Sequence, residues 1–524
     1  MRAHTPELHL PSAAISPPMM RKPAVPSAPS PRHEAARALQ NGMKLGTSLL
    51  FTWGIALLVR FWMPRHLGPD LYGSINFAEA FTTTAFVALS LGIDTYVRKE
   101  VSVRPGHATE FFATAVLLRV GLTGLLFFAM ELVLRGTHRS HEMRLLVYAF
   151  GAAQLFVSLN ATLSAILHSA GEVDGISVLS VVTKAVWAAG VFGALLSGAP
   201  LFWVPLSFLA SEAIKAASLF VLCRRHVDLR LRIDLRVTFA TLLASSAFMV
   251  NDVAVGAYFK LDATMLGMLS NDREVGYYGA ATSVAGLALM VSPLIGWVLM
   301  PVLARAAARS SDELYALTRR LLELLLAVAF PISLGLLLGA EQCVLLLFGA
   351  PFLPAVQALR ILAPMFVLTY AAIVCAVTLN LENRGWTVTA VSLAALGANA
   401  LMNRLFIPLF LERFGTGGGG VGSATALILS ELIVVGAMLI AMGRRSIEAR
   451  LVSMLVRTAL CCLLVVVADG AMASAGLGAV RLLPDAALYL ALVFLTGAVR
   501  RDEIAAIAAL ARRRHDIPPA PLAT

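Results

Sequence analysis

Apolar runs about 20 residues long alternate with short polar connectors from Leu45 almost to the end of the chain. A helix needs about 20 predominantly apolar residues to cross the hydrocarbon core of a bilayer. Only 14% of the 524 residues are charged, whereas soluble domains carry about 25%. The sequence therefore predicts an all-α polytopic membrane protein and argues against a soluble multidomain protein.

We expect about fourteen membrane-spanning helices from the spacing of these runs. The predicted spans are 44–63, 75–97, 111–134, 144–167, 176–198, 201–222, 238–258, 276–304, 321–347, 356–380, 386–410, 420–442, 451–472 and 484–499. The predicted organisation is a disordered cytoplasmic tail (1–43), an N-lobe of six spans (44–222), a basic connector (223–237), a C-lobe of six spans (238–442), two further spans (443–499) and a basic cytoplasmic tail (500–524).

Arginine and lysine gather on alternate connectors. If the N-terminus is inside, the cytoplasmic connectors carry clusters at 98–104, 224–236, 305–320, 444–450 and 500–514. The outer connectors then hold only scattered basic residues: Arg65, Arg135, Arg139, Lys260, Arg273, Arg413 and Arg481. Because positive loops stay in the cytoplasm, this bias predicts that both termini are cytoplasmic. Topology thus explains the formal charge of +11 without a nucleic-acid partner.

One local pattern occurs in both halves of the chain. Residues 67–78 read LGPDLYGSINFA, and residues 271–281 read NDREVGYYGAA. Both are short outer connectors that contain Tyr and Gly and lead into the second helix of their half. Such repeats are common in transporters that hold substrate between two halves, and we expect the same arrangement here.

These motifs resemble those of bacterial polysaccharide flippases. The resemblance begins with the turn of 67–73, the Leu91–Asp94 step and the ending Arg98-Lys99-Glu100. It continues through 260–281, 348–363 and 396–431, in the order found in that family. This family belongs to the multidrug/oligosaccharidyl-lipid/polysaccharide exporter superfamily, whose members have two bundles of six helices around a central cavity, often with two additional helices.

The resemblance implies that the chain moves a polyprenyl-diphosphate-linked oligosaccharide from the inner to the outer leaflet of the bacterial cytoplasmic membrane. The product would enter O-antigen, capsule or exopolysaccharide biosynthesis. Implied partners are the lipid-linked oligosaccharide, membrane lipids, and polysaccharide polymerase and chain-length machinery. Two alternatives are a cation-coupled multidrug exporter of the same superfamily, which would need an acidic cavity, and a membrane glycan polymerase or ligase. The latter usually needs a large outer catalytic loop, which the sequence lacks, so we expect no enzyme.

Ionisable residues inside predicted spans are candidate site residues, because a charge in lipid is costly. The predicted cationic cavity consists of Arg119, Lys184, Lys215, Arg98 and Arg60, which would attract phosphates. Arg98 is equally well explained as a topology residue, and Arg60 as a cation that extends to the outer interface.

Acidic and amide side chains complete the predicted cavity wall: Glu79, Asp94, Glu212 and Asn160. Glu212 could instead pair with Lys215 within one helix, and Asn160, Asn399 and Asn403 could join helices. Asp252 and Glu431 are candidates to bind a coupling H⁺ or Na⁺, and Asp262 is a candidate gate residue or loop anchor.

Other motifs carry no chemistry of their own. The run Gly417–Gly420 lacks the Gly-Lys-Ser/Thr of a phosphate loop and predicts a flexible turn. His138 and His141 have no further ligands nearby, so we expect no metal or other cofactor. The five cysteines lie in or beside apolar runs without metal spacing.

Overall fold

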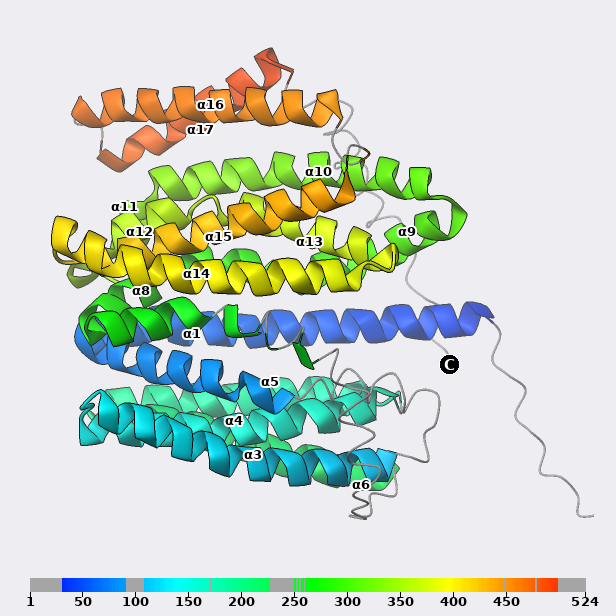
Figure 1. Cartoon of the computed structure of the whole chain (residues 1–524), viewed down its shortest axis with the longest axis vertical. Helices are drawn as coiled ribbons and strands as arrows, with labels where there is room; N and C mark the ends of the chain where they lie inside the picture. Colours follow the sequence, from blue (N-terminus) through cyan, green and yellow to red (C-terminus); the bar gives the residue numbers. More distant parts are fainter. Residues whose placement is uncertain are drawn as a thin grey trace, which may run out of the picture.

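The computed structural model describes residues 31–90, 108–169, 171–226, 260–443, 448–475 and 478–497, together with 249–250, 253, 256–258 and 445. Every regular element in this part of the chain is a helix (Figure 1). Eleven of the described helical stretches are long and apolar enough to cross a membrane, and the 45 residues of Gly46–Ser90 are long enough to cross twice. The prediction of an all-α polytopic membrane protein is confirmed.

The first group of helices packs together in the lower half of Figure 1, and we call it the N-bundle. It contains α1 (Pro31–Phe86), η1 (Val87–Ser90), α3 (Ala108–Gly136), α4 (His141–Ser169), α5 (Asp174–Leu196) and α6 (Trp203–His226). Residues 223–226 of the predicted connector thus belong to α6, and the rest of that connector lies outside the described residues.

Helix α1 differs from the prediction at both ends of its first span. It begins at Pro31, inside the predicted disordered tail, since proline suits the first helical position and the following Ala-rich stretch favours helix. The predicted loop between spans one and two is a single break at Gly68, with φ 70° and ψ 175°. Glycine tolerates this positive φ, so the chain reverses there and helix resumes at Pro69.

The second group, the C-bundle, contains residues 260–269 and the helices α8 to α15. The bounds are α8 (Asp272–Ala285), α9 (Leu287–Arg309), α10 (Ser311–Leu338), α11 (Ala340–Leu347), η3 (Ala350–Phe352), α12 (Ala355–Leu362), α13 (Met365–Leu381), α14 (Gly385–Phe414) and α15 (Gly418–Met442). The final helices α16 (Ala449–Ser474) and α17 (Leu482–Leu495), with η4 (Gly478–Arg481) between them, form a hairpin on α10 at the top of Figure 1.

Three predicted single spans are interrupted in the C-bundle. Breaks occur at Gly286, at Gly339 and at residues 363–364, before α13. Proline lacks an N–H, and glycine weakens a helix, so Pro364 and the two glycines favour these breaks. The polar residues before predicted span nine are also helical, because the Ser310 hydroxyl accepts a hydrogen bond from the Glu313 N–H (3.1 Å) and caps α10.

The predicted turn ends at Gly417, and Gly418–Gly420 instead form the closely packed start of α15. A Cβ atom on Gly418 would lie 2.3 Å from the Phe410 carbonyl oxygen of α14. The buried Glu274 carboxylate accepts hydrogen bonds from the backbone N–H groups of Gly417 (2.6 Å) and Gly420 (3.2 Å). These glycines therefore let α15 approach α14 closely, and Glu274 satisfies the start of α15.

The helices run back and forth between two ends of the molecule (Figure 1). The Gly68 break and the turns at 137–140 and 415–417 lie at one end, because Asp70, Arg139 and Gly417 all contact the first residues of α8. We call it the outer end, following the arginine bias of the sequence, and the opposite end the inner end.

Candidate functional site

The two segments that share a sequence pattern pack against each other where the bundles meet at the outer end. A Cβ atom on Gly73 would lie 1.6 Å from the Asp272 carbonyl oxygen, and one on Gly276 would lie 2.1 Å from the Pro69 carbonyl oxygen. The part of α1 after Gly68 and helix α8 therefore cross at backbone-to-backbone distance. Only glycine permits this approach, which explains why the pattern contains it in both halves.

Polar contacts hold this crossing closed. Asp272 accepts hydrogen bonds from the Ser74 hydroxyl (2.7 Å) and the Arg139 guanidinium (2.8 Å), both in the N-bundle. Beside them, Arg273 and Asp70 form an exposed ion pair of 3.0 Å. We call Ser74, Arg139 and Asp272 the outer latch. The bundles are thus joined at their outer end.

A cavity of about 300 Å³ lies against the part of α1 on both sides of the Gly68 break. Its walls come from α1, α4, α5, α6 and α9. The lining residues are Ala56, Leu57, Val59, Arg60, Met63, Tyr72, Ile75, Asn76, Glu79, Phe150, Lys184, Trp187, Val204, Phe208 and Met290. The cavity is therefore mainly an N-bundle feature that the C-bundle closes on one side.

Charged side chains converge on this cavity. Arg60, Glu79 and Lys184 line it, and the Lys260 ammonium of the C-bundle lies 2.9 Å from a Glu79 carboxylate oxygen. The Lys184 ammonium also lies 3.9 Å from the centre of the Trp187 ring, a stabilising cation–π geometry. Three cations thus gather around one carboxylate.

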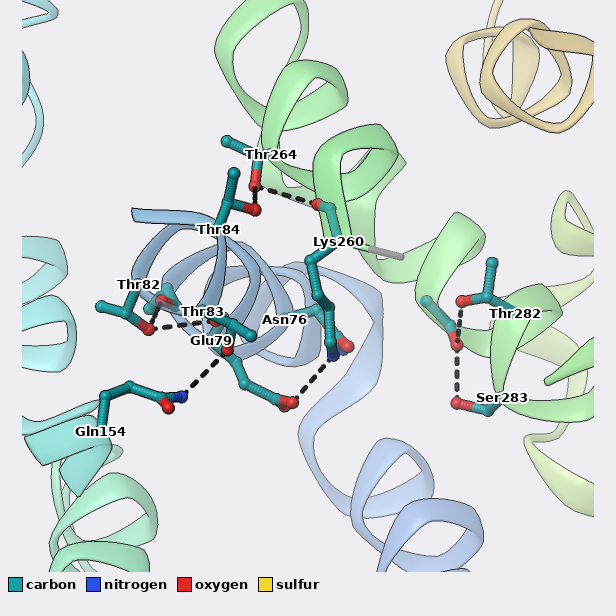
Figure 2. Close-up of polar contacts among 12 residues, drawn as sticks. Asn76, Glu79, Thr82, Thr83, Thr84, Gln154, Lys260, Thr264, Thr282 and Ser283 are labelled. Carbon is teal, nitrogen blue, oxygen red and sulfur yellow. Dashed lines mark hydrogen bonds and ion pairs between the residues drawn. The ribbon is translucent and has the colours of Figure 1, made fainter. Parts of the chain in front are cut away.

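Neutral polar groups continue the wall beside Glu79, as Figure 2 shows. The Gln154 amide donates to the Thr83 hydroxyl (3.0 Å), and the hydroxyls of Thr84 and Thr264 are 3.1 Å apart. The second contact joins the two bundles. Amides and hydroxyls of this kind can exchange their present partners for ligand hydroxyls.

Arg119 lies outside this cavity, contrary to the prediction. Its guanidinium is fully buried and donates to the Leu89 carbonyl (2.9 Å), the Ser158 carbonyl (2.5 Å) and the Thr162 hydroxyl. Leu89 belongs to η1, the last described turn of this helical segment before residue 91. Arg119 therefore joins η1, α3 and α4.

Asn160 and Glu212 likewise join helices and do not line the cavity. The Asn160 amide donates to the Glu212 carboxylate (2.8 Å) and to the Glu212 carbonyl (3.1 Å), which connects α4 to α6. Glu212 and Lys215 lie within electrostatic range of Lys184. They can therefore influence the cavity's charge from behind its wall.

The remaining predicted residues divide between two groups. Asp94, Arg98 and Asp252 lie outside the described residues. Glu431 is buried in α15 within electrostatic range of Asp262. Glu431 and Asp262 do not line the cavity, so the candidate coupling residue Glu431 is separate from the cationic site.

A buried amide pair surrounds Asp262. Its carboxylate accepts hydrogen bonds from Asn399 (3.0 Å) and Asn403 (2.6 Å) of α14. The two asparagines therefore join helices, as one of their sequence interpretations proposed. No group of three potential metal-ligating residues occurs in the part of the chain that the structure describes.

Lys260 is the site residue that sequence reasoning missed. It was assigned to an outer connector because the apolar run of predicted span seven ends at residue 258. The structure has helix at 260–269, which brings Lys260 inside the bundle interface. The available signal is the pair Lys260 and Thr264, which are four residues apart and so share one face of a helix. In the structure both contact α1, at Glu79 and Thr84.

Comparison with known proteins gives consistent results. A family model described as "Polysaccharide biosynthesis protein" matches residues 38–307. The chain is 20% identical over 407 residues to a protein named "Probable low-salt glycan biosynthesis flippase Agl15" from Haloferax volcanii, covering 75% of this chain and 80% of that protein.

Two solved structures share the fold at low sequence identity. One is described as "Lipid II flippase MurJ, inward closed conformation", with a TM-score of 0.65, 14% identity and coverage of 88% of this chain and 100% of that one. The other is an inward-facing multidrug resistance transporter of the MATE family, with a TM-score of 0.59, 14% identity and coverage of 74% and 98%. At these identities the likeness establishes the arrangement of the helices.

Proposed function

The chain belongs to the polysaccharide biosynthesis protein family, and we propose that it is a flippase for a polyprenyl-diphosphate-linked oligosaccharide. It would move this lipid from the inner to the outer leaflet of the cytoplasmic membrane during synthesis of O-antigen, capsule or exopolysaccharide. The family and fold are those of transporters and not of enzymes. The observation that carries the proposal is the gathering of Arg60, Lys184 and Lys260 around Glu79.

The charge of the cavity favours an anionic ligand. Two basic side chains, Arg60 and Lys184, and one acidic side chain, Glu79, line the cavity, and Glu79 is paired with a third basic side chain, Lys260. A diphosphate offers several acceptor oxygens, and charge-assisted hydrogen bonds to them are stronger than neutral ones. The cavity also lies between apolar helix surfaces, where electrostatic attraction is less screened than in water. The diphosphate would therefore bind between α1, α5 and the Lys260 helix.

The neutral groups beside the charges suit the sugar part of such a lipid. Asn76 lines the cavity, and Gln154, Thr83 and Thr84 lie next to Glu79. Their amides and hydroxyls can bind sugar hydroxyls. The polyprenyl chain would remain in the bilayer outside the helices.

Movement between leaflets would follow from rocking of the two bundles. The outer latch and the Gly73–Asp272 crossing close the outer end. Opening this end while the inner end closes would expose the head group to the other side of the membrane. With both termini cytoplasmic, the described closed end faces outward. A coupling H⁺ or Na⁺ would act at Glu431, which lies apart from the cavity, or at Asp252.

The cavity charge also separates this function from the multidrug alternative. A cationic drug would be repelled by Arg60, Lys184 and Lys260, and Glu79 is already paired with Lys260. The observed balance of charge therefore favours the lipid-linked glycan.

The proposal predicts that Lys184→Met abolishes most lipid translocation. Methionine keeps the length of the side chain and removes its charge, so loss of one charge-assisted contact should lower the rate by about 10- to 100-fold. The full chain would be reconstituted in liposomes with a fluorescent polyprenyl-diphosphate oligosaccharide, and the outer-leaflet fraction would be followed with an impermeant quencher.

Arg413→Met is the matched control. Arg413 is an exposed cation at the end of α14 and does not line the cavity, so this variant should translocate at the wild-type rate. Wild-type translocation by a well-folded Lys184→Met variant would contradict the cationic site. Transport of an organic cation, without transport of the lipid, would support the multidrug alternative instead.

A further inference from the structure

The Glu79–Lys260 ion pair joins the N-bundle to the C-bundle within the cavity region. The ammonium and carboxylate groups are 2.9 Å apart. The Lys260 side chain is 28% exposed and the Glu79 side chain is 34% exposed. Figure 2 shows the Glu79 side chain extending from α1 toward Lys260. Thr84 and Thr264 join the same two helical segments. The pair is therefore accessible to a ligand and contributes to contact between the bundles.

Glu79 has the same charge as the proposed ligand. Arg60 and Lys184 also lie within electrostatic range of its carboxylate. In an empty cavity these cations would repel one another without a nearby anion. The Glu79 carboxylate thus neutralises part of the cationic site and occupies the Lys260 donor that a diphosphate would use.

On the basis of the proposed function, we propose that Glu79 competes with the substrate for Lys260. Glu79 binds Lys260 in the empty cavity and releases it when an anionic diphosphate binds. The exchange needs no covalent chemistry, since the ammonium group only changes its acceptor. Because Glu79 and Lys260 belong to different bundles, the exchange also removes a contact between them. Substrate binding would in this way loosen the bundles from inside the cavity.

The geometry makes this exchange feasible. An ion pair that is about one-third exposed is partly screened by water, so it is weaker than a fully buried pair although stronger than a pair in bulk water. A diphosphate carries more charge than one carboxylate and can contact Arg60 and Lys184 at the same time. A fully buried carboxylate held by backbone N–H groups, such as Glu274 at the start of α15, would resist displacement.

The proposal predicts that Glu79→Gln tightens binding of an anionic head group. Glutamine keeps the size of the side chain and removes the competing charge. The full chain in detergent would be titrated with geranyl diphosphate, and with geraniol as the uncharged probe. We expect the dissociation constant for geranyl diphosphate to fall about two- to fivefold in Glu79→Gln, with no change for geraniol.

A double-mutant cycle identifies Lys260 as the shared partner. Lys260→Met should weaken binding of geranyl diphosphate, and the gain from Glu79→Gln should disappear when Lys260 is also Met. Glu131→Gln is the matched control, because Glu131 pairs with Arg135 in the N-bundle and lies outside the cavity. An equal gain in the Lys260→Met background, or in Glu131→Gln, would show a general charge effect and overturn the proposal.

The contact between the two bundles can be measured with cysteine substitutions at Thr84 and Thr264. The five native cysteines would first be replaced. The two threonine hydroxyls are 3.1 Å apart, so the paired cysteines should form a disulfide readily, and geranyl diphosphate should lower its yield. An unchanged yield, with tight binding retained, would overturn displacement while leaving the proposed function intact. Equal binding of geranyl diphosphate and geraniol by the wild type would instead overturn both.

Discussion

The tight crossing at the outer end makes Gly73→Ala the most informative single substitution. The new Cβ would lie 1.6 Å from the Asp272 carbonyl oxygen, whereas real Cβ contacts are essentially never closer than 3.0 Å. The two backbones must therefore separate by about 1.4 Å, the difference between these distances. Both backbones belong to closely packed helices, so neither can move aside as a flexible side chain could.

The magnitude follows from the contacts that this separation breaks. The Ser74 hydroxyl is 2.7 Å from the Asp272 carboxylate, and a shift of that size takes the pair beyond hydrogen-bond distance. Loss of a hydrogen bond to a charged group costs about 1.5–3 kcal/mol. The ratio of open to closed outer ends should rise by about 10- to 150-fold. Translocation should fall, because the outer end no longer closes.

A single cysteine at Met63 reports the state of the outer end. Met63 lines the cavity and is 8% exposed, so an impermeant thiol reagent added outside should label it slowly in the wild type. Labelling should be much faster in Gly73→Ala. The measurement would use intact cells or oriented vesicles, with the five native cysteines replaced.

Gly54→Ala is the matched control on the same helix. A Cβ there would meet no atom within 4 Å, and alanine favours helix over glycine by about 1 kcal/mol. This variant should label and translocate like the wild type. If a well-expressed Gly73→Ala variant is as protected from labelling as the wild type, the outer crossing does not control access to the cavity.

Two further substitutions test structural assignments. Arg119→Leu should lower the free energy of unfolding by about 2–4 kcal/mol, because the carbonyls of Leu89 and Ser158 lose their donor; unchanged thermal unfolding in detergent would contradict this role. Glu274→Ala should speed hydrogen exchange at the start of α15, where the Gly417 and Gly420 N–H groups lose their acceptor at a cost of about 1–3 kcal/mol. Wild-type exchange rates there would show that the carboxylate does not hold this helix end.

Local sequence pattern was sufficient for the fold class and for most helices. The length of the apolar runs identifies the spans, since bilayer thickness fixes the length that a helix must reach. Helices α5 and α15, for example, differ from their predicted spans by only two residues at one or both ends. The interruptions at Gly286 and Gly339 were not predicted, because a glycine within an apolar run is also compatible with a continuous helix.

The candidate site was only partly predictable. Lys184, Arg60 and Glu79 were selected because a charge within a span requires a reason, and all three line the cavity. The same criterion selected Arg119 and Glu212, which bind helix carbonyls and an amide instead. A charged residue within a span can either line a cavity or bind polar groups of neighbouring helices, and the sequence does not distinguish these two cases.

The amino-acid sequence by itself determined that this chain crosses a membrane many times and that its two halves share a glycine-containing turn. Only the tertiary structure decided that these turns pack on each other at Gly73 and Gly276, and that Lys260 reaches Glu79. The physical reason is the distance along the chain over which each interaction acts. Hydrophobic length and helix propensity act within a segment, whereas the pairing of charges about 180 residues apart depends on which helices pack together.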